Sequence, residues 1–121
     1  MRETDINAVL SSLNGGLSEI EASFLVSLDG LIMASALAPG MDETQTSALV
    51  AAVLTLGAQI AAEVQRGALE QVLITGTAGH ILIQQAGDHA VLCTVAGKTV
   101  KLGLLFLDTN RAAQAVKALL Q

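Results

Sequence analysis

The spacing of the apolar residues along the chain predicts three helices. In each of them, apolar side chains recur every three or four positions, which is the period of one face of an α-helix. Asp42 or Thr44 can cap the second helix, and Gly67 can end it because glycine readily adopts a left-handed conformation. Thr99 can cap the third helix. The predicted helices cover residues 3–14, 43–66 and 99–120.

Five shorter apolar runs predict β-strands. The first two flank Asp29-Gly30, a pair that favours a two-residue hairpin turn. The other three are nearly continuous in apolar residues, which is typical of a sheet covered on both faces. The predicted strands cover residues 23–28, 31–36, 71–75, 81–85 and 90–95. The order α-β-β-α-β-β-β-α and the hairpin grouping predict one α+β domain over residues 1–121, with a five-stranded antiparallel sheet between helices.

The second helix is apolar around most of its circumference, so we expect it to be buried on two sides. One stripe is bulky enough to pack on the sheet. It consists of Leu49, Val53, Leu56, Ile60 and Val64. A flanking strip contains small residues that can admit the close approach of another helix.

That strip predicts a two-fold dimer in which the long helices lie side by side and the following edge strands pair antiparallel. The alternative is a helix buried entirely within one subunit. The predicted dimer interface consists of Val50, Leu54, Gly57, Ala58, Ala61, Val72, Leu73 and Ile74.

Composition supports an oligomer and argues against several classes of function. Only 14% of the 121 residues are charged, whereas about 25% is usual, so part of the surface is expected to be hidden. A net charge of −5 and two aromatic residues argue against nucleic-acid binding. The single Cys93 is expected to be a reduced, buried thiol in a cytoplasmic protein. Residues 44–62 carry no charge, but polar residues interrupt them, so we expect no membrane insertion.

No group of residues specifies an enzyme, a cofactor or a metal. The segment Ala96-Gly97-Lys98-Thr99 ends like a phosphate-binding loop, but Leu92 occupies the position of the first glycine. The set of His80, His89 and Cys93 could form a metal site with Asp88, or a Cys-His dyad, although the spacing matches no known pattern. The alternative is an edge histidine and a core thiol. We therefore predict no catalytic, cofactor-binding or metal-binding residue.

Three segments resemble the Roadblock/dynein light chain superfamily, particularly its prokaryotic MglB-like members. They are FLVSLDGLIMAS at residues 24–35, RGALEQVLI at 66–74 and LGLL at 102–105, and the resemblance covers nearly the whole chain. It implies a profilin-like α/β/α sandwich that forms a homodimer through the long helix and the strand after it.

The resemblance also implies a non-enzymatic role. Superfamily members bind small Ras-like GTPases and regulate their nucleotide cycle, or they act as scaffolds in motor or signalling complexes. The GTPase would supply the chemistry, while its regulator would shift the switch loops. The sequence stops soon after the last helix, without the additional C-terminal segment of some MglB-like regulators, so GTPase binding is a firmer expectation than GTPase activation.

We expect the partner to contact the polar side of the long helix at Thr55, Gln59, Ala62 and Arg66. Two other hypotheses stay open at this point. One is a self-assembling adaptor in a signalling or motility complex that binds no GTPase. The other is a small-molecule sensor or enzyme that uses a pocket near His80, His89 and Cys93.

Overall fold

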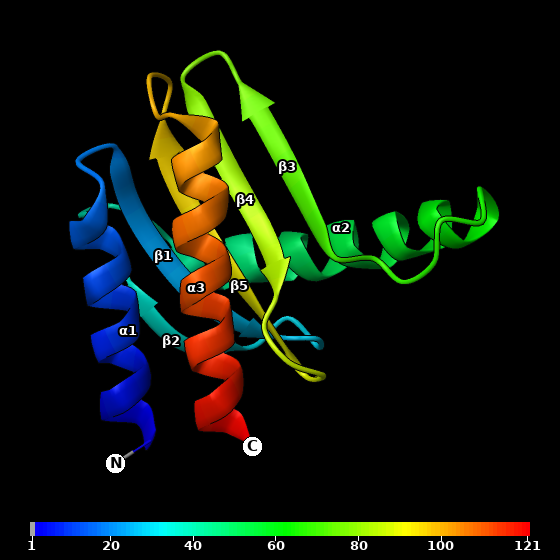
Figure 1. Cartoon of the computed structure of the whole chain (residues 1–121), viewed down its shortest axis with the longest axis horizontal. Helices are drawn as coiled ribbons and strands as arrows, with labels where there is room; N and C mark the ends of the chain where they lie inside the picture. The colour runs from blue at the N-terminus through cyan, green and yellow to red at the C-terminus, as the bar shows by residue number, and fades with distance from the viewer. Residues whose placement is uncertain (1) are drawn as a thin grey trace.

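Helices and strands follow one another in the predicted order in this computed structural model, which describes residues 2–121 (Figure 1). The helices are α1 (Arg2–Gly16), α2 (Glu43–Glu63) and α3 (Leu102–Leu120). The strands are β1 (Ile20–Ser27), β2 (Ile32–Ala36), β3 (Gln71–Gly76), β4 (Gly79–Gln85) and β5 (Ala90–Gly97). The predicted α+β fold is therefore confirmed.

The five strands form one antiparallel sheet in the order β2-β1-β5-β4-β3. Its centre is β5, where Cys93 lies opposite Phe24 of β1 on one side and opposite Ile83 of β4 on the other. Helices α1 and α3 lie on one face of the sheet and α2 crosses the other (Figure 1). Both faces are therefore covered by helices, as the apolar strands predicted, and β2 and β3 are the two edges.

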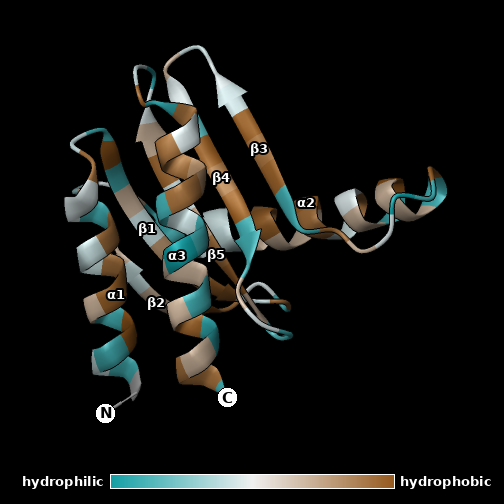
Figure 2. Ribbon diagram, in the orientation of Figure 1, coloured by the Kyte–Doolittle hydropathy of each residue, from teal (hydrophilic) through white to brown (hydrophobic). Residues whose placement is uncertain are grey.

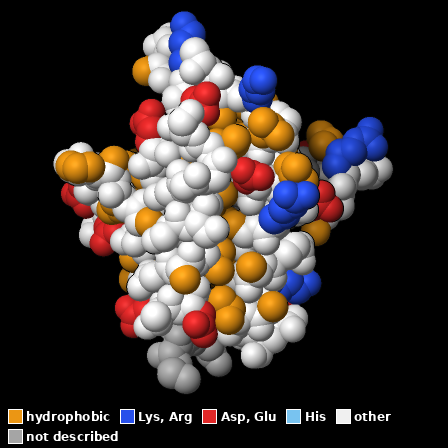
Figure 3. Space-filling model, turned by 60° about the vertical axis from the view of Figure 1, so that its left-hand side comes forward, with side chains coloured by type: hydrophobic (Ala, Val, Ile, Leu, Met, Phe, Trp, Pro, Cys, Tyr) orange, Lys and Arg blue, Asp and Glu red, His pale blue; other side chains and the backbone are white. Residues whose placement is uncertain are grey.

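Side chains alternate between two cores, one on each face of the sheet. Leu25, Leu82 and Leu92 point toward α1 and α3, where Leu10 and Leu105 are fully buried. The neighbouring strand positions point toward α2 and form a smaller core with Val50. This core consists of Phe24, Val26, Val50, Ile83, Val91 and Cys93. Figure 2 shows hydrophobic residues along β3 and β4. Figure 3 is turned so that α1 is in front, and it shows hydrophobic side chains along the line where α1 meets α3.

The β1–β2 hairpin has a three-residue loop, so the predicted two-residue turn is wrong. The Gly30 amide donates to the Ser27 carbonyl at 3.0 Å, and the Ser27 amide donates to the Leu31 carbonyl at 2.8 Å. Gly30 has φ 88°, whereas Asp29 is not in the left-handed region. This is the geometry of a type I turn followed by a left-handed glycine, which a single glycine is enough to provide.

Helix α2 begins as predicted and ends earlier than predicted. The Asp42 side chain accepts the Thr44 amide at 3.0 Å, which confirms Asp42 as the cap. At the other end Gln65, with φ 57°, takes the left-handed position that we expected for Gly67. The Arg66 amide then donates to the Ala61 carbonyl at 2.8 Å and the Gln65 amide to the Ala62 carbonyl at 3.1 Å, a pair of bonds typical of the Schellman motif.

Helix α3 begins at Leu102, so the prediction that Thr99 caps it is wrong. Lys101 occupies the cap position without a side-chain hydrogen bond. The chain first turns after β5, where the Val100 amide donates to the Gly97 carbonyl at 3.3 Å. Val100 is buried in the α1–α3 core, and this anchoring places the exposed Thr99 in the turn before the helix.

Candidate functional site

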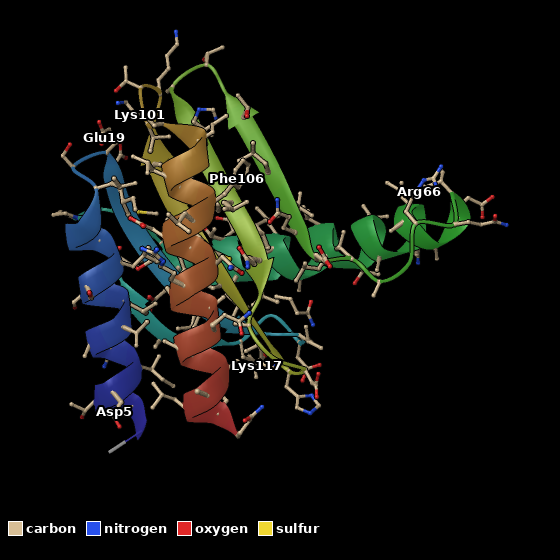
Figure 4. All side chains as sticks on the ribbon, in the orientation of Figure 1. Asp5, Glu19, Arg66, Lys101, Phe106 and Lys117 are labelled. Carbon is tan, nitrogen blue, oxygen red and sulfur yellow. The ribbon has the colours of Figure 1, made fainter. Side chains whose placement is uncertain are left out.

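Helix α2 is longer than its own sheet is wide. Its 21 residues span about 32 Å, whereas the axes of the two edge strands in a five-stranded sheet lie about 19 Å apart. Ser47 and Val50, both near its start, are its buried residues. The C-terminal part of the helix extends past β3, and Arg66 lies at the far end of this projection (Figures 1 and 4).

The bulky stripe of α2 faces solvent, which corrects the prediction that it packs on the sheet. The exposed fraction is 60% for Leu49, 59% for Leu56, 63% for Ile60 and 53% for Val64. Val53 alone in this stripe packs partly against the core beneath the helix. Four large apolar side chains are therefore accessible in one chain, so within a single subunit the helix is buried on one side only.

Within the small strip, Gly57 faces β3 and the segment before it, which pass close under the helix. A Cβ atom at Gly57 would lie 3.0 Å from Leu69 Cδ2 and 3.5 Å from Val72 Cγ2. Even a methyl group at this position would therefore be tight against the Leu69 side chain, which would have to shift to make room. The glycine that we assigned to contact with another helix therefore serves contact within the chain.

The predicted dimer-interface residues occupy three different environments. Val50 is 3% exposed and packs in the core of its own subunit, so a second copy could not reach it. Ala58 and Ile74 are exposed. The half-buried residues are Leu54, Gly57, Ala61, Val72 and Leu73, of which Leu73 packs toward α3 rather than α2.

We define the α2–β3 face as the exposed apolar residues Leu49, Leu56, Ile60, Val64 and Ile74. A shallow hollow of about 340 Å³ adjoins Ile74 and is lined in part by Ile81 and Val95. Both are half-buried on the face of the sheet that α2 crosses. Apolar surface therefore continues from the helix to the sheet edge.

Strand β3 is the less protected of the two sheet edges. Its six residues pair with β4 in unbroken register and include no charged residue and no proline. Edge β2 is shorter, its pairing with β1 shifts register next to Val26, and its Ala36 carbonyl accepts the Asn14 side-chain amide at 2.9 Å. Short length, irregular pairing and side-chain capping all discourage strand addition, so β3 is the edge open to a further strand.

The structure brings the predicted partner-contact residues together on exposed surface. Thr55, Gln59 and Ala62 lie on one side of α2, away from the sheet, and Arg66 follows the end of the helix. The Thr55 hydroxyl donates to the Ala51 carbonyl at 3.1 Å and therefore stays close to the helix. Beside them runs a groove of about 460 Å³, lined in part by Leu28, Leu54, Ala58 and Leu69.

The residues considered for metal binding or catalysis do not meet. His89 is exposed in the β4–β5 turn, and His80 receives or donates a 3.0 Å hydrogen bond with the Thr75 hydroxyl. Cys93 lies in the core under α2, together with Ile83 of β4. Side chains alternate along a strand, so His80 points to the opposite face of the sheet from Ile83. Among residues 2–121, no three His, Cys, Asp or Glu residues are grouped to hold a metal ion.

Burial explains the state of the Cys93 thiol. The side chain is fully buried, and loss of solvation raises the pKa of this thiol from 9.0 to about 12. The thiolate is the nucleophilic form of cysteine, so this group is poorly suited to catalysis near neutral pH.

The segment Ala96-Gly97-Lys98-Thr99, which ends like a phosphate-binding loop, lies next to an acidic side chain. A Glu21 carboxylate oxygen is 3.2 Å from where a Gly97 Cβ would be, and its negative charge disfavours a bound anion.

The stripe of exposed leucine and isoleucine residues is the functional feature that the sequence reasoning assigned wrongly. Periodicity identified the stripe but could not tell which of two adjacent apolar strips faces the sheet. The length of the predicted helix was an available signal, because a helix longer than the sheet must leave some of its apolar residues uncovered.

Among the described helices, α2 is the one that is long and apolar enough to cross a membrane. This criterion uses length and composition alone, and core helices of soluble proteins also meet it.

Sequence comparison finds one family model and a relative that matches over nearly its full length. The family model of the Roadblock/LC7 domain matches residues 7–96. Uncharacterized protein MJ1340 of Methanocaldococcus jannaschii is 35% identical over 114 residues, which cover 94% of this chain and 98% of that protein. The match to this relative therefore extends over nearly all of both chains.

Solved structures share the fold at low sequence identity. Myxococcus xanthus MglB superposes with a TM-score of 0.90 at 22% identity, over 97% of this chain and 95% of that one. A structure described as MglB with tetrameric arrangement gives 0.89 at 20% identity, over 98% and 89%. Acanthamoeba castellanii profilin IB gives 0.67 at 12% identity, over 93% and 96%, in agreement with the expected profilin-like sandwich. The family match over most of the chain, together with this fold, establishes that the protein belongs to the Roadblock/LC7 family.

Proposed function

We propose that this protein is a homodimeric, non-enzymatic platform that binds a small Ras-like GTPase and modulates its nucleotide cycle. The observation that carries the proposal is the α2–β3 face, an apolar surface that joins a projecting helix to an unprotected strand edge. Membership of the Roadblock/LC7 family and the likeness to MglB support the GTPase as the partner. The MglB structure with a tetrameric arrangement supports self-association.

In the proposed dimer, two copies meet around a two-fold axis beside β3. Antiparallel pairing of the two β3 strands would satisfy the open edge and extend the sheet across both subunits. The projecting end of each α2 then covers apolar surface of the other copy. Ala58 and Ile74 remain proposed interface residues, and the exposed stripe adds Leu49, Leu56, Ile60 and Val64.

The outward sides of the two α2 helices then form one composite surface for the GTPase. The residues proposed to contact it are Thr55, Gln59, Ala62 and Arg66, all of which are exposed. A regulator with no chemical group of its own can act by preferring one arrangement of the switch loops. A tenfold preference for one nucleotide state corresponds to about 1.4 kcal/mol of differential binding free energy.

The test is a binding titration with a purified Ras-like GTPase encoded in the same genome, loaded with GDP or with a non-hydrolysable GTP analogue. We expect tighter binding in one nucleotide state. Replacing Gln59→Glu and Arg66→Glu together should weaken that binding by about tenfold or more, because both residues belong to the proposed contact surface and both changes add negative charge to it. No binding in either state would refute GTPase recognition and favour a self-assembling adaptor.

A matched variant separates a local effect from a change in total charge. Gln114→Glu and Lys117→Glu alter exposed residues of α3 and change the net charge by the same amount. This variant should bind the GTPase like the unchanged protein. Equal losses for both variants would reject the placement of the site on α2 while leaving GTPase binding itself intact.

A further inference from the structure

A second groove lies between α1 and α3, on the face of the sheet opposite α2. Its volume is about 520 Å³, which makes it larger than the groove beside α2. Val9, Leu13 and Ala112 contribute apolar surface to its floor. Figure 3 looks at this side of the molecule and shows hydrophobic side chains along the line between the two helices. None of the residues proposed for the dimer or the GTPase lines this groove.

The walls of this groove are built from small side chains. Ala8, Ser12 and Gly16 follow one another at four-residue steps along α1, and Ala115 stands on α3. Side chains at four-residue steps lie one above another on a helix face, so the α1 wall extends over about 12 Å. Small walls let another backbone come close, and this length matches two to three turns of an added helix.

The charges at the groove are separated along its length. Asp108 places a carboxylate oxygen 3.2 Å from where a Gly16 Cβ would be, directly at the C-terminal end of α1. The last turn of α1 carries no basic residue, so the partial negative charge of its carbonyls adds to that carboxylate. Arg111 stands one turn farther along α3 and lines the same groove. The groove therefore has a negative end at Asp108, and the positive charge of Arg111 lies one helical turn away from that end.

We propose that this groove binds an amphipathic helix of a partner protein. A small or medium apolar side chain of that helix inserts between the alanine walls, and a lysine or arginine pairs with Asp108 at the end of α1. Helix-in-groove docking of this kind needs an apolar anchor and a charge that sets direction. The proposal does not rest on GTPase binding, and it gives the protein a second, independent surface on the other side of the sheet.

The protein lacks tryptophan and tyrosine, so the emission of one tryptophan in a synthetic peptide can report binding directly. The probes are 15-residue helix-forming peptides with a central leucine as the anchor, a tryptophan next to it as the fluorescent reporter, and one lysine placed either one turn before or one turn after the leucine. Two matched peptides carry glutamate in place of lysine. We expect one lysine peptide to bind at least about tenfold more tightly than its glutamate counterpart, because only lysine can pair with Asp108.

Three variants of the protein test where the peptide binds. Ala8→Phe fills the groove and should abolish binding, whereas Ala118→Phe, on the exposed side of α3, should leave it unchanged. Asp108→Lys should reverse the preference so that the glutamate peptide binds more tightly. Phenylalanine keeps the peptide tryptophan as the sole indole, and circular dichroism checks that each variant folds.

The proposal is overturned if no peptide binds the unchanged protein. It is also overturned if lysine and glutamate peptides bind equally, or if Ala8→Phe leaves binding intact. The proposal is also contradicted if another copy of this chain occupies the groove. In that case the protein would assemble beyond a dimer, and Ala8→Phe would abolish the larger assembly. The GTPase titration is independent of all these results.

Discussion

At the scale of single residues, the fold depends on positions where the backbone leaves no room for a side chain. Gly79 begins β4 opposite Gly97, and a Cβ atom added to it would collide with the Ala96 carbonyl oxygen of β5. The colliding atom belongs to the backbone of the central strand, which cannot move away cheaply. Gly103, by contrast, lies near the start of α3 with open space around it.

We predict that Gly79→Ala and Gly103→Ala change stability in opposite directions. Gly79→Ala should lower the free energy of unfolding by about 1–3 kcal/mol because it overpacks the sheet. Gly103→Ala should raise it by up to about 1 kcal/mol because alanine favours the helix more than glycine does. Urea denaturation measures both. An unchanged stability for Gly79→Ala would mean that β4 and β5 separate more easily than their register indicates.

The buried thiol of Cys93 predicts a loss of stability at alkaline pH. Its pKa is about 12 in the fold against 9.0 ordinarily, so the folded state favours the protonated form. The associated stability is complete below pH 9 and is lost as pH rises toward 12. At pH 10.5 the loss should be about 2 kcal/mol. Denaturation at pH 8 and pH 10.5 measures it, and Cys93→Ala should show a correspondingly smaller decrease between the two.

At the scale of elements, α2 explains both the success and the failure of the sequence analysis. Local signals located the helix and limited its cap to Asp42 or Thr44, of which the structure shows Asp42, since capping is a property of neighbouring residues. The helical period of apolar residues predicted for α1 and α3 is also present in the structure, where Leu10 and Leu105 lie in the shared core. The orientation of α2 depends on Leu69 and Val72 packing under Gly57, a long-range contact that no local pattern contains. The polar contact residues on its outward side were placed correctly on exposed surface, but their role stays a prediction.

The exposed stripe of α2 predicts which substitutions dissociate the dimer. Leu56→Gln with Ile60→Gln should give a monomer, because burial of each such side chain contributes about 1.5–3 kcal/mol and the two-fold axis doubles every change. Glutamine favours helix, so α2 should stay intact. The control, Thr55→Gln with Ala62→Gln, makes two substitutions on the outward side and should stay dimeric. Sedimentation velocity distinguishes the two, and a dimer that survives loss of the stripe would place the interface elsewhere.

At the scale of the whole molecule, the sheet separates two surfaces of different character. One carries the bulky apolar stripe and an open strand edge, which suit a permanent contact with a second copy. The other carries a groove of small residues with an acidic end, which suits a smaller segment of another protein. The low content of charged residues, 14%, is consistent with two contact surfaces, since a large part of the surface would then be buried against other proteins.

The most direct test of this account is the mass of the unchanged protein in solution. Light scattering coupled to size exclusion at about 10 µM should give about 24.8 kDa, twice the 12.4 kDa of one chain, because the α2–β3 face is too apolar to stay in water. The mass should persist in high salt, since the proposed contact is apolar rather than ionic. A mass of 12.4 kDa at this concentration would contradict the dimer and, with it, the composite surface proposed for the GTPase.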